Sequence, residues 1–257
     1  MNNLKILKIS CCGANEFNDI NEIIKFLKKN PRAEIGIGVS NQSTAHSRIR
    51  YNWIAHLFQT LKENSINGQT ALHVNKLWSK IVAINGVLPL DLIELINNAP
   101  RDLRLQINFV GSGYACEAKK PEKLLKLINK CNKVKFILPY SPISANFITS
   151  LREKTNNFDV LYDQSYGSGT LAQSYQSVFE NTLQGYAGGF SPENIQKELG
   201  KICSTQKKKT GIWIDAEGKL RQDNCNALDL NKAQDFINNI VSWENSVNKK
   251  CIDMLIK

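Results

Sequence analysis

The chain has 257 residues, 42% of them hydrophobic and 22% charged, which suits one or two globular domains with a full hydrophobic core. Its 15 glycines and 7 prolines are close to average usage, which excludes collagen-like and low-complexity classes. No run of about 18 apolar residues occurs, so no membrane span is expected. The N-terminal segment lacks the basic and apolar regions of a signal peptide, and we expect a cytoplasmic protein.

The formal net charge is +10, from 33 basic and 23 acidic side chains. Such a balance suits nucleic acid, anionic lipid or phosphorylated metabolites as partners. Many of the basic residues lie in helix-like stretches, and the tightest run, Lys207 to Lys209, contains no aromatic residue. We therefore interpret the charge as a lysine-rich solvent face and expect no nucleic-acid partner.

The cysteines and histidines show no metal-binding or disulfide pattern. The seven cysteines are scattered, and none belongs to a C-x-x-C pair. The three histidines, His46, His56 and His73, do not stand at metal-ligand spacing from any cysteine. We therefore predict reduced thiols, no disulfide framework, and no metal or organic cofactor.

Strand-like and helix-like segments alternate along the chain. Short apolar runs predict strands, and apolar residues at helical spacing, such as Ile20, Ile23, Ile24 and Leu27, predict amphipathic helices. In chain order the predicted segments are strand 4–11, helix 19–29, strand 33–39, helix 51–62, strand 69–74, helices 77–85 and 90–97, strand 103–110, helix 121–129, strand 134–139, helix 144–154, strand 158–162, helix 171–181, strand 184–187, helix 191–202, strand 211–215 and helix 230–243.

Eight strand-then-helix units in 257 residues match the size of a (β/α)8 TIM barrel of the α/β class. Strands that alternate with helices imply parallel pairing and right-handed crossovers. A doubly wound open sheet is the alternative, but neither of its phosphate-loop motifs, G-x-G-x-x-G or G-x-x-x-x-G-K-[ST], occurs. No linker interrupts the pattern, so we predict a single barrel domain over residues 1–257.

In such a barrel the active site forms where the carboxyl ends of the strands meet the following loops. His73 and Asn75, like Gln106 and Asn108, stand two residues apart, so each pair faces one side of its strand. We expect that side to be the barrel interior near its mouth. These side chains either bind a substrate or form a buried hydrogen-bond network, and the sequence leaves both interpretations open.

The loop that follows strand 184–187 begins with Gly188 and Gly189. Two glycines let backbone N–H groups approach an anion closely, and a helix opened by Ser191 as N-cap and Pro192 would add its dipole. An ordinary turn before a capped helix is the alternative. Barrel phosphate sites concentrate after strands seven and eight, so we expect phosphate-binding loops there.

Motifs in the last third resemble phosphoribosylanthranilate isomerase, the sugar-phosphate isomerase of tryptophan biosynthesis. Asp163, followed by Gly167 and Gly169, resembles that family's strand-six aspartate and Gly-Thr-Gly-type loop. Segment 187–195, AGGFSPENI, is close to the family's Ala-Gly-Gly-Leu-Thr-Pro-Glu-Asn-Val phosphate loop. The motifs indicate a ribulose-phosphate-binding type of barrel.

The two ends of the chain carry further, looser matches. Asp215 and Gly218 resemble the family's strand-eight Asp and the nearby Ser-Gly pair. Segment 8–13, KISCCG, resembles Lys-Ile-Cys-Gly, whose Cys is the family's general base. Strand alternation from Lys8 predicts that Cys12 faces inward, although a bulge could exchange it with Cys11. Lys8 on the same face could lower the pKa of the inward thiol.

The resemblance implies a role for each matched residue. The proton-transfer pair would be Asp163 as general acid and Cys11 or Cys12 as general base. The expected phosphate-binding residues are Gly188, Gly189, Asp215 and Gly218. The residues expected to bind the rest of the substrate are Arg50, His73, Asn75, Asn108, Gly167 and Gly169.

The chain also departs from the family pattern. Glu217 replaces the Ser of the strand-eight Ser-Gly pair, and a carboxylate there would repel a phosphate. The N-terminal motif contains an inserted Ser-Cys, and the family's Ser-Pro-Arg segment has only a rough counterpart in Ser47–Tyr51. The match is good over 158–240, loose at the N-terminus and poor over 40–150. We therefore expect a divergent member or a paralogue.

The leading hypothesis is an isomerase that acts on a phosphorylated sugar derivative by acid/base, Amadori-type chemistry. One alternative is another phosphate-ligand barrel enzyme, such as a lyase or aldolase, for which Lys8 is the candidate Schiff-base lysine. The other is a catalytically retired barrel that serves as a binding protein. We expect a monomer or homodimer whose partner is a phosphorylated small molecule.

Overall fold

The computed structural model of the chain describes residues 4–41, 45–108, 121–165, 167–179, 182–205, 211–223 and 225–255. The basic run at 207–209, Cys116 and the last two residues of predicted strand 103–110 lie outside these ranges. Within them, no helix is both long and apolar enough to cross a membrane.

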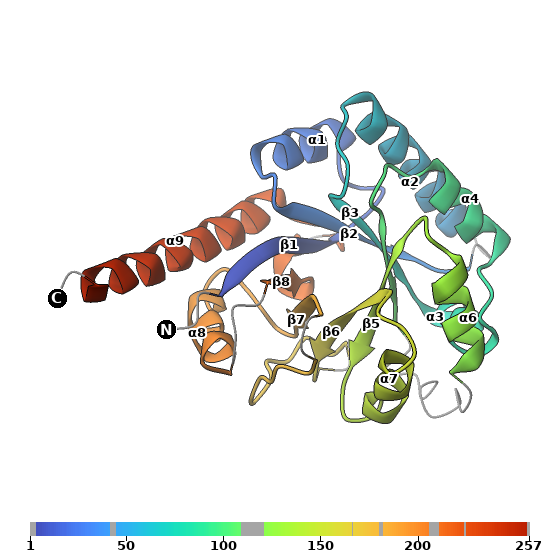
Figure 1. Cartoon of the computed structure of the whole chain (residues 1–257). Helices are drawn as coiled ribbons and strands as arrows, with labels where there is room; N and C mark the ends of the chain where they lie inside the picture. Colours follow the sequence, from blue (N-terminus) through green and yellow to red (C-terminus); the bar gives the residue numbers. More distant parts are fainter. Residues whose placement is uncertain are drawn as a thin grey trace.

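Eight parallel strands close into a barrel in which each strand pairs with the next and β8 pairs with β1 (Figure 1). The predicted (β/α)8 barrel is therefore confirmed. The strands are β1 (Lys5–Ala14), β2 (Ala33–Val39), β3 (Thr70–Val74), β4 (Arg104–Ile107), β5 (Lys135–Tyr140), β6 (Phe158–Asp163), β7 (Gln184–Ala187) and β8 (Gly211–Ala216).

Helices surround the barrel on its outer side (Figure 1). The α-helices are α1 (Ile20–Lys29), α2 (Ala45–Glu63), α3 (Lys76–Lys80), α4 (Leu90–Asn98), α6 (Glu122–Lys130), α7 (Ala145–Arg152), α8 (Ile195–Thr205) and α9 (Leu230–Leu255). The π-helix η1 (Ile81–Asn85) continues α3, and the 3-10 helix η2 (Gly218–Leu220) follows β8.

Helix α1 shows why these segments fold as predicted. The Asp19 side chain caps it by accepting the backbone N–H groups of Asn21 and Glu22. Its apolar residues at helical spacing, among them Ile23 and Leu27, are fully buried against the outer face of the barrel. The N-terminal cap and the buried apolar face of α1 thus both agree with the predicted amphipathic helix.

Successive strand residues alternate between a large outer core, which the helices cover, and the barrel interior. The interior has an apolar middle layer, formed by Ile137, Leu161, Ala187 and Trp213. At the amino-terminal end of the strands, which we call the floor, the interior is charged instead. The floor ion pairs join Lys8 and Arg104 to Glu34, and Lys135 and Arg104 to Asp159.

The predicted helix 171–181 is wrong, because residues 171–179 form an irregular segment between β6 and β7. Its backbone forms hydrogen bonds with side chains of β7 instead of helical hydrogen bonds. Gln184 accepts the N–H of Val178 at 2.8 Å and donates to the carbonyl of Gln176 at 2.7 Å. Tyr186 donates to the same carbonyl.

The predicted start of helix 191–202 is also wrong. Residues 192–194 form a turn, and α8 begins at Ile195. The side chain of Asn194 spans this turn, since it accepts the N–H of Ser191 and donates to the carbonyl of Gly189. The backbone N–H of Ile195 donates to the carbonyl of Ser191 at 3.1 Å, so this turn leads directly into α8.

Candidate active site

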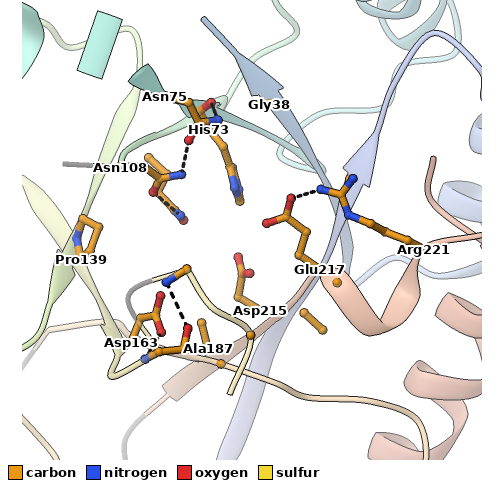
Figure 2. A pocket seen from close by; sticks show the side chains of 18 of the residues that line it. Gly38, His73, Asn75, Asn108, Pro139, Asp163, Ala187, Asp215, Glu217 and Arg221 are labelled. Atoms are coloured by element: carbon orange, nitrogen blue, oxygen red, sulfur yellow. Dashed lines mark hydrogen bonds and ion pairs between the residues drawn. The ribbon is translucent and has the colours of Figure 1, made fainter. Parts of the chain in front are cut away.

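A cavity of about 1150 Å³ opens at the carboxyl ends of the strands (Figure 2). Its walls come from the ends of the strands and from the loops that follow them. It contains most of the residues that the sequence singled out, namely Arg50, His73, Asn75, Asn108, Asp163, Gly167, Gly169, Gly188, Gly189, Asp215 and Gly218. Cys11 and Cys12 are not part of its lining.

The two adjacent cysteines of β1 face opposite sides of the barrel wall. Cys11 is fully buried in the outer core, where it packs with apolar residues. Cys12 is buried inside the barrel, with its Sγ 3.7 Å from Nε2 of His73 and 3.5 Å from Oδ2 of Asp215. The position of Cys11 excludes contact with a substrate in the cavity, so a base role for it is wrong.

The surroundings of Cys12 are acidic, which contradicts the expectation of an activated thiol. Burial raises the pKa of the Cys12 thiol well above its ordinary value, and the carboxylates of Asp215, Glu217 and Glu34 raise it further. The expected cation, Lys8, lies at the floor, where it pairs with Glu34 at 3.4 Å and donates to the carbonyl of Gly68. A thiolate base at neutral pH is therefore not supported.

Asp215 of β8 and His73 of β3 both contact Cys12 of β1. Burial raises the pKa of Asp215 to about 8, and the negative charges of Glu217 and Glu34 add to the rise. Burial lowers the pKa of His73 below its ordinary value. Both shifts favour the uncharged form of the side chain, because burial disfavours charge.

Amide side chains continue this layer around β3 and β4. Gln106 donates to Asn108 at 2.8 Å, Asn108 donates to Asn75 at 2.9 Å, and Asn75 donates to the carbonyl of His73. Oε1 of Gln106 is buried and has no hydrogen-bond partner among the described residues. These residues therefore form the predicted hydrogen-bond network, and all four of them, His73, Asn75, Gln106 and Asn108, also line the cavity.

Asp163 stands at the end of β6 and points into the cavity (Figure 2). Its Oδ1 accepts the backbone N–H of Ser165 at 2.8 Å, which fixes the carboxylate at the start of the following loop. Glu217 enters the cavity from the end of β8, on the other side of Asp215 (Figure 2). From the sequence we expected Glu217 only to repel a phosphate group.

The charge of Glu217 is offset by Arg221, which pairs with it four residues along the chain. Arg50 is likewise paired, with Glu16, at 2.5 Å. Lys219 in η2 also lines the cavity, is exposed, and forms no ion pair with any described residue. Sequence reasoning missed Lys219, although its place directly after strand eight was a usable signal.

The glycine loops after β6 and β7 pack against each other. Gly188 and Gly189 have φ values of 111° and 66°, which favour glycine. A Cβ on Gly189 would lie 2.6 Å from the carbonyl oxygen of Gly169, and one on Gly188 would lie 2.9 Å from that of Thr170. These glycines therefore serve the close approach of two loops at the mouth, whatever ligand those loops bind.

No protein-family model and no curated protein matches the chain by sequence. Solved structures match it by fold. The truncated form of 3-deoxy-D-arabino-heptulosonate 7-phosphate synthase from Thermotoga maritima matches with a TM-score of 0.53 and 10% identity, over 96% of this chain and 88% of that one. KGPDC from Streptococcus mutans matches with a TM-score of 0.44 and 10% identity, over 94% of this chain and 99% of that one. Identity this low shows a shared barrel fold alone.

Proposed function

We propose that the protein is an isomerase that converts a phosphorylated aldose derivative into the corresponding ketose form by acid/base chemistry. The observation that carries this proposal is the open cavity lined by two carboxylates, Asp163 at the end of β6 and Glu217 directly after β8, together with the glycines of the loops that follow β6 and β7. Carboxylate pairs on opposite sides of a substrate are a common means of moving protons.

The phosphate of the substrate would bind at the mouth beside β7 and β8. These strands are neighbours in the barrel, so the Gly188–Gly189 loop and η2 lie close together. Lys219 supplies a positive charge there, and Arg221 offsets the negative charge of Glu217. The mouth can therefore hold an anion despite Glu217.

The chemistry requires two proton transfers. Asp163 would donate a proton to the ring oxygen of the aldose derivative as the C1–O bond breaks. A base would then take the C2 proton, so that the C1–C2 enediol or enaminol forms. The protonated base would return this proton to C1, while the C2 hydroxyl gives its proton to the Asp163 carboxylate and becomes the C2 ketone. Glu217 faces the cavity and takes the base role that Cys12 does not fill, because Cys12 lies outside the lining.

Two alternatives have less support. Lys8, the Schiff-base lysine expected for an aldolase, lies at the floor and does not line the cavity, and the lysines that do line it, Lys76 and Lys219, are exposed. A retired barrel would be expected to fill its mouth with its own side chains, whereas the mouth is a cavity of about 1150 Å³. A phosphate-binding enzyme with another reaction is the remaining competitor, and the experiment below separates it from an isomerase.

The test begins with a thermal-shift screen of sugar phosphates and phosphoribosyl conjugates of aromatic amines, phosphoribosylanthranilate included. A ligand that binds only the native state raises the melting temperature. Each ligand found is then incubated with the protein in deuterium oxide and followed by NMR. We expect deuterium at the carbon that loses or regains a proton, together with the ketose product. Binding with neither exchange nor product would overturn the isomerase proposal.

A further inference from the structure

Cys12, His73 and Asp215 form a compact group of possible metal ligands inside the barrel. They come from β1, β3 and β8, and all three residues are buried. Their sulfur, nitrogen and oxygen donor atoms all lie within 4.8 Å of one another. This group goes beyond the proposed isomerase function, which assigns no reaction step to it.

The distances from the sulfur of Cys12 to the other two donor groups match the edges of a tetrahedral metal site. Sγ of Cys12 is 3.7 Å from Nε2 of His73, and 3.6 and 3.5 Å from the two carboxylate oxygens of Asp215. Tetrahedral Zn²⁺, with Zn–S bonds of about 2.3 Å and Zn–N or Zn–O bonds of about 2.0–2.2 Å, places such atoms about 3.5–3.7 Å apart. Both spacings from the thiol therefore already fit one ion, and the third, between His73 and Asp215, is within 4.8 Å.

The neighbouring strand β2 leaves room for these donors to meet. Gly36 pairs with Cys12 across the β1–β2 ladder. A Cβ on Gly36 would lie 2.3 Å from Sγ of Cys12 and 3.0 Å from Nε2 of His73. Any side chain at this position would occupy the space between the thiol and the imidazole, so the cradle depends on a glycine.

The group is also open on one side. His73 and Asp215 line the cavity, while Cys12 lies outside that lining. Figure 2 shows the side chains of His73 and Asp215 directed toward each other from opposite walls. Oε1 of Gln106 is a buried acceptor without a partner among the described residues, and His73 is the strand neighbour of Gln106. A water bound to an ion here could donate to that oxygen.

We propose that Cys12, His73 and Asp215 bind one divalent transition-metal ion, with a fourth coordination position open to the cavity. A thiolate, an imidazole and a carboxylate together favour Zn²⁺ over Mg²⁺ or Ca²⁺, which prefer oxygen ligands alone. Three protein ligands with one open position is the arrangement of catalytic rather than structural zinc sites. An ion there could polarise a hydroxyl or carbonyl oxygen of a substrate.

The test uses metal alone, without substrate. Untagged full-length protein is treated with EDTA, dialysed, and titrated with Zn²⁺ and with Co²⁺. We expect one equivalent of tightly bound metal by elemental analysis. With Co²⁺ we expect the intense visible bands of tetrahedral coordination and a near-ultraviolet thiolate-to-metal charge-transfer band. Absence of metal binding, or a Co²⁺ spectrum without the thiolate band, overturns the proposal and leaves the isomerase proposal untouched.

Matched variants identify the ligands. Cys12→Ser and Asp215→Asn should each weaken Zn²⁺ binding by more than about 100-fold, because even outer-shell partners of a metal are worth about 10–100-fold. Cys11→Ala is the control, since it removes the adjacent buried thiol on the other face of β1 and should bind Zn²⁺ like the wild type. Equal loss of binding in Cys11→Ala and Cys12→Ser would contradict the assignment.

Discussion

Arg104 of β4 forms a bidentate ion pair with Glu34 of β2 across the barrel floor, with N···O distances of 2.6 and 2.8 Å. Both side chains are buried, and Arg104 also lies over the Trp213 ring, 4.4 Å from its centroid. Buried charges are stable only when each is compensated. The floor is therefore held by charge pairing below the apolar layer that Trp213 helps to form.

Removing the cation should destabilise the protein strongly. In Arg104→Met, Glu34 loses both contacts to the guanidinium and keeps those to Lys8 and Ser10. We expect the free energy of unfolding, measured by urea denaturation, to fall by roughly 3 kcal/mol or more. The double variant with Glu34→Gln should recover a large part of that loss. A loss below about 1 kcal/mol in the single variant would show that the pair is not needed.

The same ion pair predicts that the free energy of unfolding falls at acid pH. Burial by itself raises the pKa of Glu34, but Arg104, Lys8 and Ser10 outweigh it and bring the pKa down to about 2. Because the folded-state pKa lies below the ordinary value of 4.5, the stabilisation is complete above about pH 4.5 and disappears as the pH falls toward 2.

The unfolding free energies of the wild type and of Glu34→Gln should therefore differ more at pH 6 than at pH 3. Chemical denaturation at several pH values measures this difference. Glu22→Gln, which removes an exposed partner of Lys25 on α1, should leave the pH slope as it is in the wild type. A constant gap between wild type and Glu34→Gln across this range would contradict the assignment.

Two glycine-to-alanine changes should have opposite signs. At Gly189 a Cβ would meet the backbone of the loop after β6 at 2.6 Å, and φ is 66°, so we expect a loss of about 1–3 kcal/mol of stability. At Gly200, within α8, a Cβ would meet nothing within 4 Å, and alanine should add about 0.5–1 kcal/mol. Thermal or urea unfolding of both variants tests the loop packing directly.

Lys219→Ala should weaken the binding of a phosphate-bearing ligand by about tenfold or more, because a hydrogen bond to a charged group is worth about 1.5–3 kcal/mol. Calorimetry with inorganic phosphate, and with any sugar phosphate that the thermal-shift screen finds, measures the effect. Lys197→Ala on α8 removes an exposed lysine that does not line the cavity and should bind as the wild type does. Equal affinities in all three proteins would move the phosphate site away from η2.

Asp163→Asn should lower kcat by about 100-fold or more while ligand binding is retained. Asparagine keeps an oxygen that can accept the N–H of Ser165, so the loop should stay in place. Steady-state kinetics and the melting temperature of the variant separate a chemical effect from a structural one. A variant that keeps more than a tenth of the wild-type rate would remove Asp163 from the general-acid role.

The sequence by itself determined the barrel and the place of its mouth. Eight alternating apolar runs and amphipathic helices can bury their apolar faces together only in a few parallel arrangements, and length favoured the closed one. The bounds of β2 and β7 agree with the predicted ranges 33–39 and 184–187. The sequence also marked Asp163 and Gly188 as residues of the mouth, because the ends of parallel strands gather at one side.

Local pattern failed where distant partners decide the structure. Segment 171–179 has no helix, and the side chains of Gln184 and Tyr186 on β7 form hydrogen bonds with its backbone N–H and carbonyl groups. Lys8 was expected to activate Cys12, but it lies four residues before Cys12 on β1, at the floor, where it pairs with Glu34 of β2. Spacing along the chain carries no information on such contacts.

Only the closure of the barrel decided which groups meet inside it. Cys12 is 61 residues from His73 and 203 from Asp215, so no spacing rule could connect them. Pairing of β8 with β1 brings the first and last strands together, and Gly36 on β2 leaves the gap across which the thiol and the imidazole approach. The sequence gives the chemical type of each side chain directly. The distances between side chains follow instead from strand register and from the volume that neighbouring residues leave free.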